Sequence, residues 1–118
     1  MTLSQVIAHV DEVKPNAFSN ETKTMWLNEV EGMVQTEVFL FHPVEVIQYD
    51  YTADKDKLAY PPHDKLYAPY LEARIDYANG EYNKYQNTMQ MFNSFYGEFM
   101  RWYADTYQPA DAHREGLI

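Results

Sequence analysis

The sequence predicts an all-α fold, a small bundle of about four helices that ends in a long C-terminal helical hairpin. Two observations carry this prediction. Apolar and aromatic residues recur at the spacing of an amphipathic helix along several segments, and proline or asparagine–glycine breaks separate those segments. We expect one helical domain over residues 1–108 and a flexible C-terminal tail over residues 109–118, with a short β-hairpin-like or extended loop between the second and third helices.

The N-terminal part is expected to form two helices. The first is predicted over Leu3–Val13, because Thr2 and Gln5 have the spacing of a capping box. The second is predicted over residues 20–39, with Ser19 or Asn20 as its cap. Their inward faces are predicted to be Leu3, Val6, Ile7, Val10 and Val13 in the first helix, and Leu27, Val30, Val34 and Val38 in the second.

Residues 44–51 are β-branched and partly alternate in polarity, which predicts an extended strand. A charged turn over residues 52–57 and a short segment over residues 58–60 follow, so that a hairpin is possible. An isolated two-stranded hairpin is marginal in water. We therefore expect this loop to pack on its own helices or on another molecule.

The third helix is predicted to begin at a cap on Asp64 and to end at Asn79-Gly80, and the fourth to run from Glu81 to Tyr107. The inward stripe of the fourth is predicted to be Tyr82, Tyr85, Met89, Phe92, Tyr96, Phe99 and Tyr103. The third helix, at about 15 residues, can cover only half of the fourth, at about 27. The uncovered half is expected to pack on the first two helices or on a neighbouring subunit.

No catalytic motif stands out, since the chain lacks a phosphate-binding glycine loop, a zinc-binding helix and a nucleophile elbow. The aspartates at 50, 54 and 56 do not have the spacing of a calcium loop. The four histidines lie in different segments and are expected to be surface or capping residues: His9, His42, His63 and His113. We therefore expect no enzyme, no cofactor and no metal site. The absence of an apolar run of about 18 residues predicts no membrane partner.

One stretch differs from the rest of this acidic chain, whose formal net charge is −9. Residues 85–97 carry no charge, although 23% of the chain is charged. Charge depletion with retained polarity is typical of protein interfaces, while an ordinary polar surface remains the alternative. The predicted contact residues are Gln86, Asn87, Gln90, Asn93, Ser94 and Gly97.

Four stretches carry a family resemblance: residues 6–34 (VIAHVDEVKPNAFSNETKTMWLNEVEGMV), the turn-rich middle of the chain, residues 61–103 and the short polar tail. The most specific part reads LY-x-x-YLEARIDYANGEYNKYQN over residues 66–87, followed by MFN-x-x-Y over residues 91–96. With these stretches the chain resembles the small head–tail connector proteins of long-tailed bacteriophages and prophages, also called head-completion or adaptor proteins.

The resemblance implies a structural virion protein that forms a ring, a dodecamer in the virion, beneath the portal protein. The ring would extend the DNA channel and dock a stopper or tail-completion protein, while DNA passes nearby without specific binding. The expected location is the virion neck, and the bacterial host cytoplasm during assembly; a monomer in isolation is left open. Further candidate contacts lie in the loop and the tail: Tyr49, Tyr51, Asp54, Asp56, His113 and Arg114.

Two other functions remain open. The acidic balance admits a DNA-mimicking anti-restriction protein, although that function needs carboxylates spaced like phosphates on one surface, and here acids and bases are interleaved. The helical pattern also admits a non-viral protein-binding module. A ring predicts oligomers and binding to portal protein, whereas a mimic predicts binding to a nuclease.

Overall fold

The computed structural model describes residues 1–51 and 63–107, and over these ranges it confirms the all-α class, with four α-helices and no strand. The helices are α1 (Leu3–Val13), α2 (Asn20–Met33), α3 (Tyr67–Ala78) and α4 (Tyr82–Thr106), with a π-helical extension of α2 (Val34–Val38) and two 3-10 turns (Pro43–Glu45 and His63–Leu66). Helix bounds therefore agree closely with those predicted.

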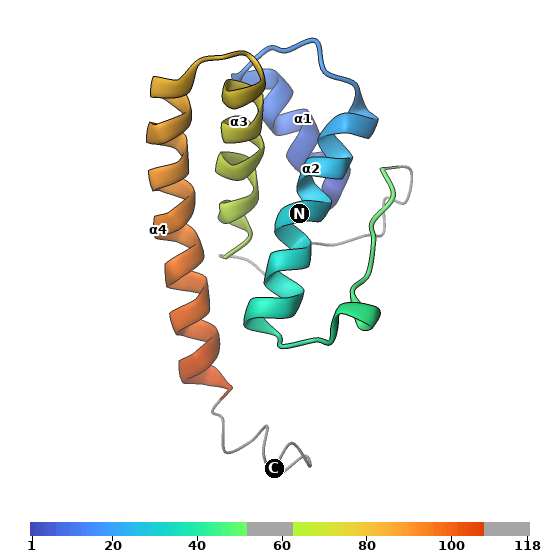
Figure 1. Ribbon diagram of the computed structural model, residues 1–118, viewed down its shortest axis with the longest axis vertical. Helices are drawn as coiled ribbons and strands as arrows, with labels where there is room; N and C mark the ends of the chain where they lie inside the picture. The colour runs from blue at the N-terminus through green and yellow to red at the C-terminus, as the bar shows by residue number, and fades with distance from the viewer. Residues whose placement is uncertain (52–62, 108–118) are drawn as a thin grey trace.

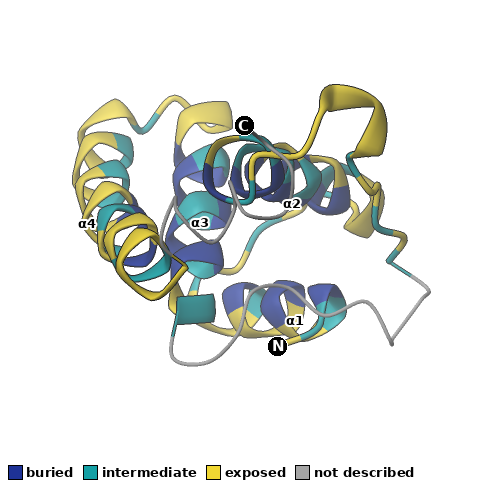
Figure 2. Ribbon diagram, turned by 90° about the horizontal axis from the view of Figure 1, so that it is seen from below, coloured by how far each residue is buried: buried dark blue, intermediate teal, exposed yellow. Residues whose placement is uncertain are grey.

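The helix α3 is central, since α1, α2 and α4 all pack against it. In Figure 1, α4 stands at one edge of the molecule, antiparallel to α3, and α2 lies on the other side of α3. Figure 2 shows α1 on a separate level, across α2 and α3, and shows α4 with its buried side toward α3 and its outer side exposed. The outer side of α4 is thus free of the rest of the described chain.

Local signals set the helix starts. The Thr2 hydroxyl accepts a hydrogen bond from the Gln5 backbone N–H, and the Gln5 side chain accepts one from the Thr2 N–H, which confirms the capping box. Ser19 caps α2 by accepting from the Thr22 N–H. The predicted cap at Asp64 is wrong. Its carboxylate does not accept from N–H groups of the helix. It binds the positively charged N-terminal ammonium group, at 3.0 Å.

The core combines aliphatic side chains of α1 and α2 with rings of α3 and α4. Phe92, Tyr96 and Phe99 of the predicted aromatic stripe are buried, whereas Tyr82 is 57% exposed. Val13, the last residue of α1, is exposed too, and no other element of the described residues covers it. The predicted stripes are therefore confirmed at their centres and wrong at these two ends.

The C-terminal half of α4 extends past α3, as its length predicted, and the chain covers it with its own turns. Phe99 lies against His63 of the 3-10 turn, with ring centroids 5.6 Å apart. Tyr103 lies against Phe39, just after the π-helical extension, at 5.1 Å. On its inner side this half is therefore covered by the end of the chain's own second helix, as expected, and also by the 3-10 turn that precedes α3.

The predicted strand over residues 44–51 is wrong, since this segment begins in a 3-10 turn and continues without regular structure. Side chains of α2 take the place of a partner strand. The Gln35 amide exchanges two hydrogen bonds with the backbone of Ile47, at 2.8 and 3.1 Å. The Asn28 amide does the same with the backbone of Tyr49, at 2.7 and 3.0 Å. A carboxamide offers one acceptor and two donors, so it can replace a peptide group in such pairing.

The rest of the predicted hairpin, residues 52–60, lies outside the described residues, as does the predicted tail over residues 109–118.

Candidate functional site

The charge-free stretch of α4 forms an exposed surface. Five of the predicted contact residues are exposed and the sixth, Gly97, is half-buried. We call these residues, with the 53% exposed Met91, the α4 face: Gln86, Asn87, Gln90, Met91, Asn93, Ser94 and Gly97. Charged residues flank it at both ends, where Lys84 pairs with Glu81 and Glu98 pairs with Lys65.

Gly97 has no steric reason within its own described chain. A Cβ atom built on it would meet no atom within 4 Å, and its φ is not in the left-handed region. A glycine inside a helix costs about 1 kcal/mol relative to alanine. Nothing in the described part of the subunit offsets this cost. The open space above Gly97 permits close approach by another molecule.

The loop candidates face the core of their own subunit. The hydroxyl of Tyr49 donates to a carboxylate oxygen of Glu31 at 2.8 Å, and Tyr51 is half-buried against the core. These two tyrosines are thus not brought together with the α4 face. The other candidates lie outside the described residues: Asp54, Asp56, His113 and Arg114.

A second exposed surface is formed by residues that were not among the predicted contact residues, although two of them lie in the loop that was predicted to make contacts. Leu40 is 69% exposed, Val44 is 94% exposed and Ile47 is 57% exposed, with Phe41 beside them at 39%. We call these four residues the loop patch. The sequence contains apolar residues past the end of α2, but the partial alternation over residues 44–51 led to the prediction of an extended strand.

Leu40 is also unusual in its backbone, with a φ of 62° that places it in the left-handed region. Helices commonly end with glycine in this conformation, because a side chain there is strained by about 1 kcal/mol or more. Here the turn follows the π-helical end of α2, where the Phe39 N–H donates to the Val34 carbonyl at 3.0 Å. The chain thus combines a strained backbone with an exposed apolar side chain at one residue.

Glu31 is a buried carboxylate that sequence reasoning missed. It accepts hydrogen bonds from the hydroxyls of Tyr67 at 2.6 Å and Tyr49 at 2.8 Å, and only 3% of it is exposed. Burial raises the pKa of its carboxyl group, and the two hydrogen bonds act in the opposite direction. The signal was present, because Glu31 occupies a position of the apolar stripe between Leu27 and Val34.

Asp76 is the second buried carboxylate, and it forms an ion pair with a lysine. The ammonium group of Lys14 lies 2.7 Å from one of its oxygens, and the Thr88 hydroxyl donates to the other at 3.0 Å. The three residues belong to the end of α1, to α3 and to α4, so one carboxylate ties three helices together.

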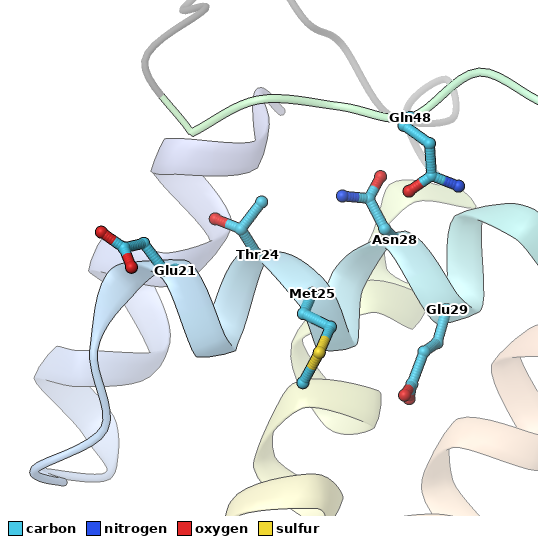
Figure 3. A pocket seen from close by; sticks show the side chains of 6 residues that line it. All are labelled: Glu21, Thr24, Met25, Asn28, Glu29 and Gln48. Carbon is cyan, nitrogen blue, oxygen red and sulfur yellow. The ribbon is translucent and has the colours of Figure 1, made fainter.

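A shallow, open depression of about 450 Å³ lies on α2, and Gln48 closes one side of it. Figure 3 shows that its two acidic side chains, Glu21 and Glu29, stand at opposite ends and do not point toward a common centre. The remaining lining residues are Thr24, Met25 and Asn28. The polar groups therefore do not converge on one point, as a site for catalysis or a small ligand requires.

Within residues 1–51 and 63–107, no group of three or more histidine, aspartate or glutamate side chains could hold a metal ion. None of the helices in these ranges is both long and apolar enough to cross a bilayer. Comparisons with protein-family models, with curated proteins and with solved structures found no match.

Proposed function

We propose that this chain is a structural assembly protein of a bacteriophage or prophage, a head–tail connector. In this proposal, copies of the chain form a ring beneath the portal protein, extend the DNA channel and dock a stopper or tail-completion protein. The proposal rests on the family resemblance, whose most specific part lies in residues 66–87 and 91–96. The observation on the structure that supports it best is the α4 face.

The α4 face suits assembly because it is long, exposed and without charge. Residues 86–97 extend over about 17 Å of helix at 1.5 Å per residue. Surfaces that remain in water usually carry lysine and glutamate, whereas the centres of protein interfaces are depleted of charged residues. The chain has a net charge of −9, so contact between two copies tends to bring like charges together. Contact through the uncharged α4 face avoids this repulsion.

The internal use of acidic side chains argues against the DNA-mimic alternative. A mimic needs carboxylates that are free and regularly spaced on one surface, but several acids of the described ranges are engaged within the subunit. Those with a hydroxyl or cationic partner are Asp11, Glu29, Glu31, Glu37, Asp64, Asp76, Glu81 and Glu98.

The proposal is tested by mixing the purified protein with portal rings encoded by the same genome. Electron microscopy is expected to show added density at one end of the portal, and sedimentation to show co-migration of the two proteins. Failure of the purified protein to bind the portal ring in both measurements would reject the connector function.

A matched pair of variants examines the α4 face in this assay. Gln90→Lys with Ser94→Lys places two charges on the face, and we expect it to weaken ring assembly on the portal by about tenfold or more, since unpaired charges at an interface are costly. Ala8→Lys with Ala17→Lys adds the same charge at exposed positions on α1 and the loop after it. Equal assembly by both variants would remove the α4 face from the proposal.

A further inference from the structure

The end of α2 contains one residue more than a regular α-helix would have in the same turn. The Phe39 N–H donates at 3.0 Å to the carbonyl of Val34, five residues earlier, whereas an α-helix pairs residues four apart. Compared with an uninterrupted α-helix, such a turn rotates the residues after it by about 100°, the angle of one residue. We call the observed arrangement the π register and an uninterrupted helix the α register.

The two registers place different phenylalanines on the inner side of α2. In the π register Phe39 faces α4, and its ring centroid lies 5.1 Å from that of Tyr103 and 6.2 Å from that of Phe99. The apolar stripe of α2, however, keeps spacings of three or four residues up to Phe41. Its members are Leu27, Val30, Val34, Val38 and Phe41. This is the period of a regular helix, so the α register turns Phe41 inward and Phe39 away.

The π register has a cost at the two residues that follow it. Leu40 is strained at a φ of 62°, and Phe41 remains 39% exposed in the loop patch. In the α register Leu40 takes a helical φ and Phe41 packs on the inner side. The sequence permits this extension, because Pro43 disfavours helical geometry only from His42 onward.

The helix α4 supplies the contacts that offset this cost. One is the ring packing at Phe39, and the other is a hydrogen bond of 2.6 Å from the Tyr96 hydroxyl to Glu37, which lies inside the π-helical turn. A change of register moves Glu37 away from Tyr96. Gln35 lies at the start of the turn, where the two registers differ least, so its two hydrogen bonds with Ile47 fit both.

We propose that the end of α2 is a conformational switch that exchanges between the π register and the α register. The exchange moves Phe41 from the exposed loop patch to the inner side of α2 and turns Phe39 outward, while Ile47 stays bound to Gln35. The switch therefore changes the apolar surface that the molecule exposes beside α2. π-helical turns within helices are frequent at functional sites, and two packings of one element are a known basis of switching. The inference does not depend on the connector function.

Nuclear magnetic resonance relaxation dispersion on the purified protein tests the exchange, since it detects minor states on the microsecond to millisecond timescale. We expect Phe39, Leu40 and Phe41 to exchange with a minor state in which the Phe41 carbonyl shift is helical. Tyr96→Phe removes the hydrogen bond to Glu37 and keeps the ring, so the minor state should become about five times more populated. Absence of exchange in both proteins would reject the switch.

A matched pair of alanine variants tests which ring holds each register. Phe39→Ala removes the inner contact of the π register, so the α register should become the major state. The coupling constant between the amide proton and Hα of Leu40 then changes to a helical value. Phe41→Ala removes the inner contact of the α register, so the exchange should disappear. A Leu40 that keeps its positive φ in Phe39→Ala would show that only one register exists.

A change at Leu40 separates backbone strain from packing. Leu40→Gly relieves the strain of the π register and weakens the helix of the α register, so the minor state should become at least about tenfold less populated. Leu40→Ala is the control, because alanine removes the same side chain but retains the strain. Equal minor populations in the two variants would show that the φ of Leu40 does not distinguish the registers, and would contradict the proposal.

Discussion

Where α1, α3 and α4 meet, the buried Asp76 carboxylate pairs with the Lys14 ammonium group at 2.7 Å. Where α2 faces α3 and the segment over residues 46–51, the buried Glu31 carboxylate accepts hydrogen bonds from two tyrosine hydroxyls. The first region neutralises its buried charge with a cation. The second offers neutral donors, and burial raises the pKa of Glu31.

The difference follows from the elements that each buried carboxylate joins. Asp76 joins three regular helices, and a charge-assisted pair adds strength to a junction that has a fixed geometry. Glu31 joins α2 and α3 to a segment without regular structure, in the same stripe of α2 as the amides of Asn28 and Gln35. The two amides bind the segment through neutral hydrogen bonds, and Glu31 binds it through the hydroxyl of Tyr49, an uncharged donor. The comparison indicates that the junction is rigid and that the segment is held more weakly.

Removing the cation from the junction is expected to have the largest effect. Lys14→Met leaves the Asp76 carboxylate, whose side chain is 2% exposed, without its counter-charge. We expect a loss of about 3 kcal/mol in the free energy of unfolding, because an unpaired buried charge is strongly destabilising. Urea unfolding of the two proteins measures it.

The matched control for this change is Lys65→Met. Its partner is Glu98, and both side chains of that pair are 48% exposed. Loss of such a pair costs about 0.5 kcal/mol. Equal losses in the two variants would show that the junction has no special role and would remove one side of the comparison.

At Glu31 the expected effect is smaller and depends on pH. Glu31→Ala leaves the Tyr67 hydroxyl buried without its acceptor, and we expect a loss of about 2 kcal/mol. Glu31→Gln keeps an acceptor and removes the buried charge, so its loss at neutral pH is expected to be smaller. Urea unfolding of both variants at one pH measures the difference.

The sign of the pH dependence follows from the raised pKa. In the folded state Glu31 retains its proton at pH values where the unfolded chain, near its ordinary 4.5, has lost it. Its contribution to stability is therefore greatest at low pH and declines as pH rises through the window above 4.5. The stability of the natural chain relative to Glu31→Gln should decline over that window. An increase would show that the tyrosines outweigh the burial.

Replacing the two amides that bind the segment is expected to act locally. Gln35→Ala or Asn28→Ala removes a pair of backbone hydrogen bonds, at Ile47 or Tyr49 respectively. We expect each variant to lose about 1 kcal/mol in the free energy of unfolding. Amide exchange at Ile47 and Tyr49 is expected to be about tenfold faster, with little change in α3. Hydrogen-exchange mass spectrometry measures both, and Gln90→Ala is the control. Equal acceleration in α3 would mean that the segment and the helices unfold as one unit.

The same contrast explains what the sequence could predict. Both ends of α1, the cap of α2 and the turn before α4 depend on residues a few positions apart, so capping and periodicity identify them. The α4 face was likewise visible, because a lack of charge along a helix is a property of the sequence itself. Its use as an interface stays a prediction.

Long-range pairing could not be predicted in this way. The alternation over residues 44–51 fits a strand, but the partners of its backbone are side chains 12 and 21 residues earlier. Propensity carries no information on such partners. The strand was therefore wrong, and within the loop Tyr49 was predicted as a contact residue although it points inward, while the exposed Val44 and Ile47 were not named. Glu31 was missed for another reason, since a glutamate in an apolar stripe is usually at its exposed margin.

Tyr70 and Glu29 form a more exposed version of the pair at Glu31, and we expect the smallest effect there. The Tyr70 hydroxyl donates to Glu29 at 3.0 Å. Burial, followed by this hydrogen bond and the charge of Glu29, raises the pKa of Tyr70 to about 12. The contribution of this pair is fully present below pH 10, the ordinary value, and is lost as pH rises through about 12. At neutral pH, Tyr70→Phe should cost about 0.5 kcal/mol, since water can replace the partner at an exposed site.

Titration of tyrosinate absorbance in the folded protein separates the two causes of the raised pKa of Tyr70. Tyr70→Phe should remove one late-titrating group from the curve. Glu29→Gln removes the carboxylate charge but leaves the burial, so the pKa of Tyr70 should move only part of the way back toward 10. A full return would show that the carboxylate controls Tyr70. The tyrosine–carboxylate pairs of this protein would then depend on charge, as the Lys14–Asp76 junction does, and the distinction between the two regions would be lost.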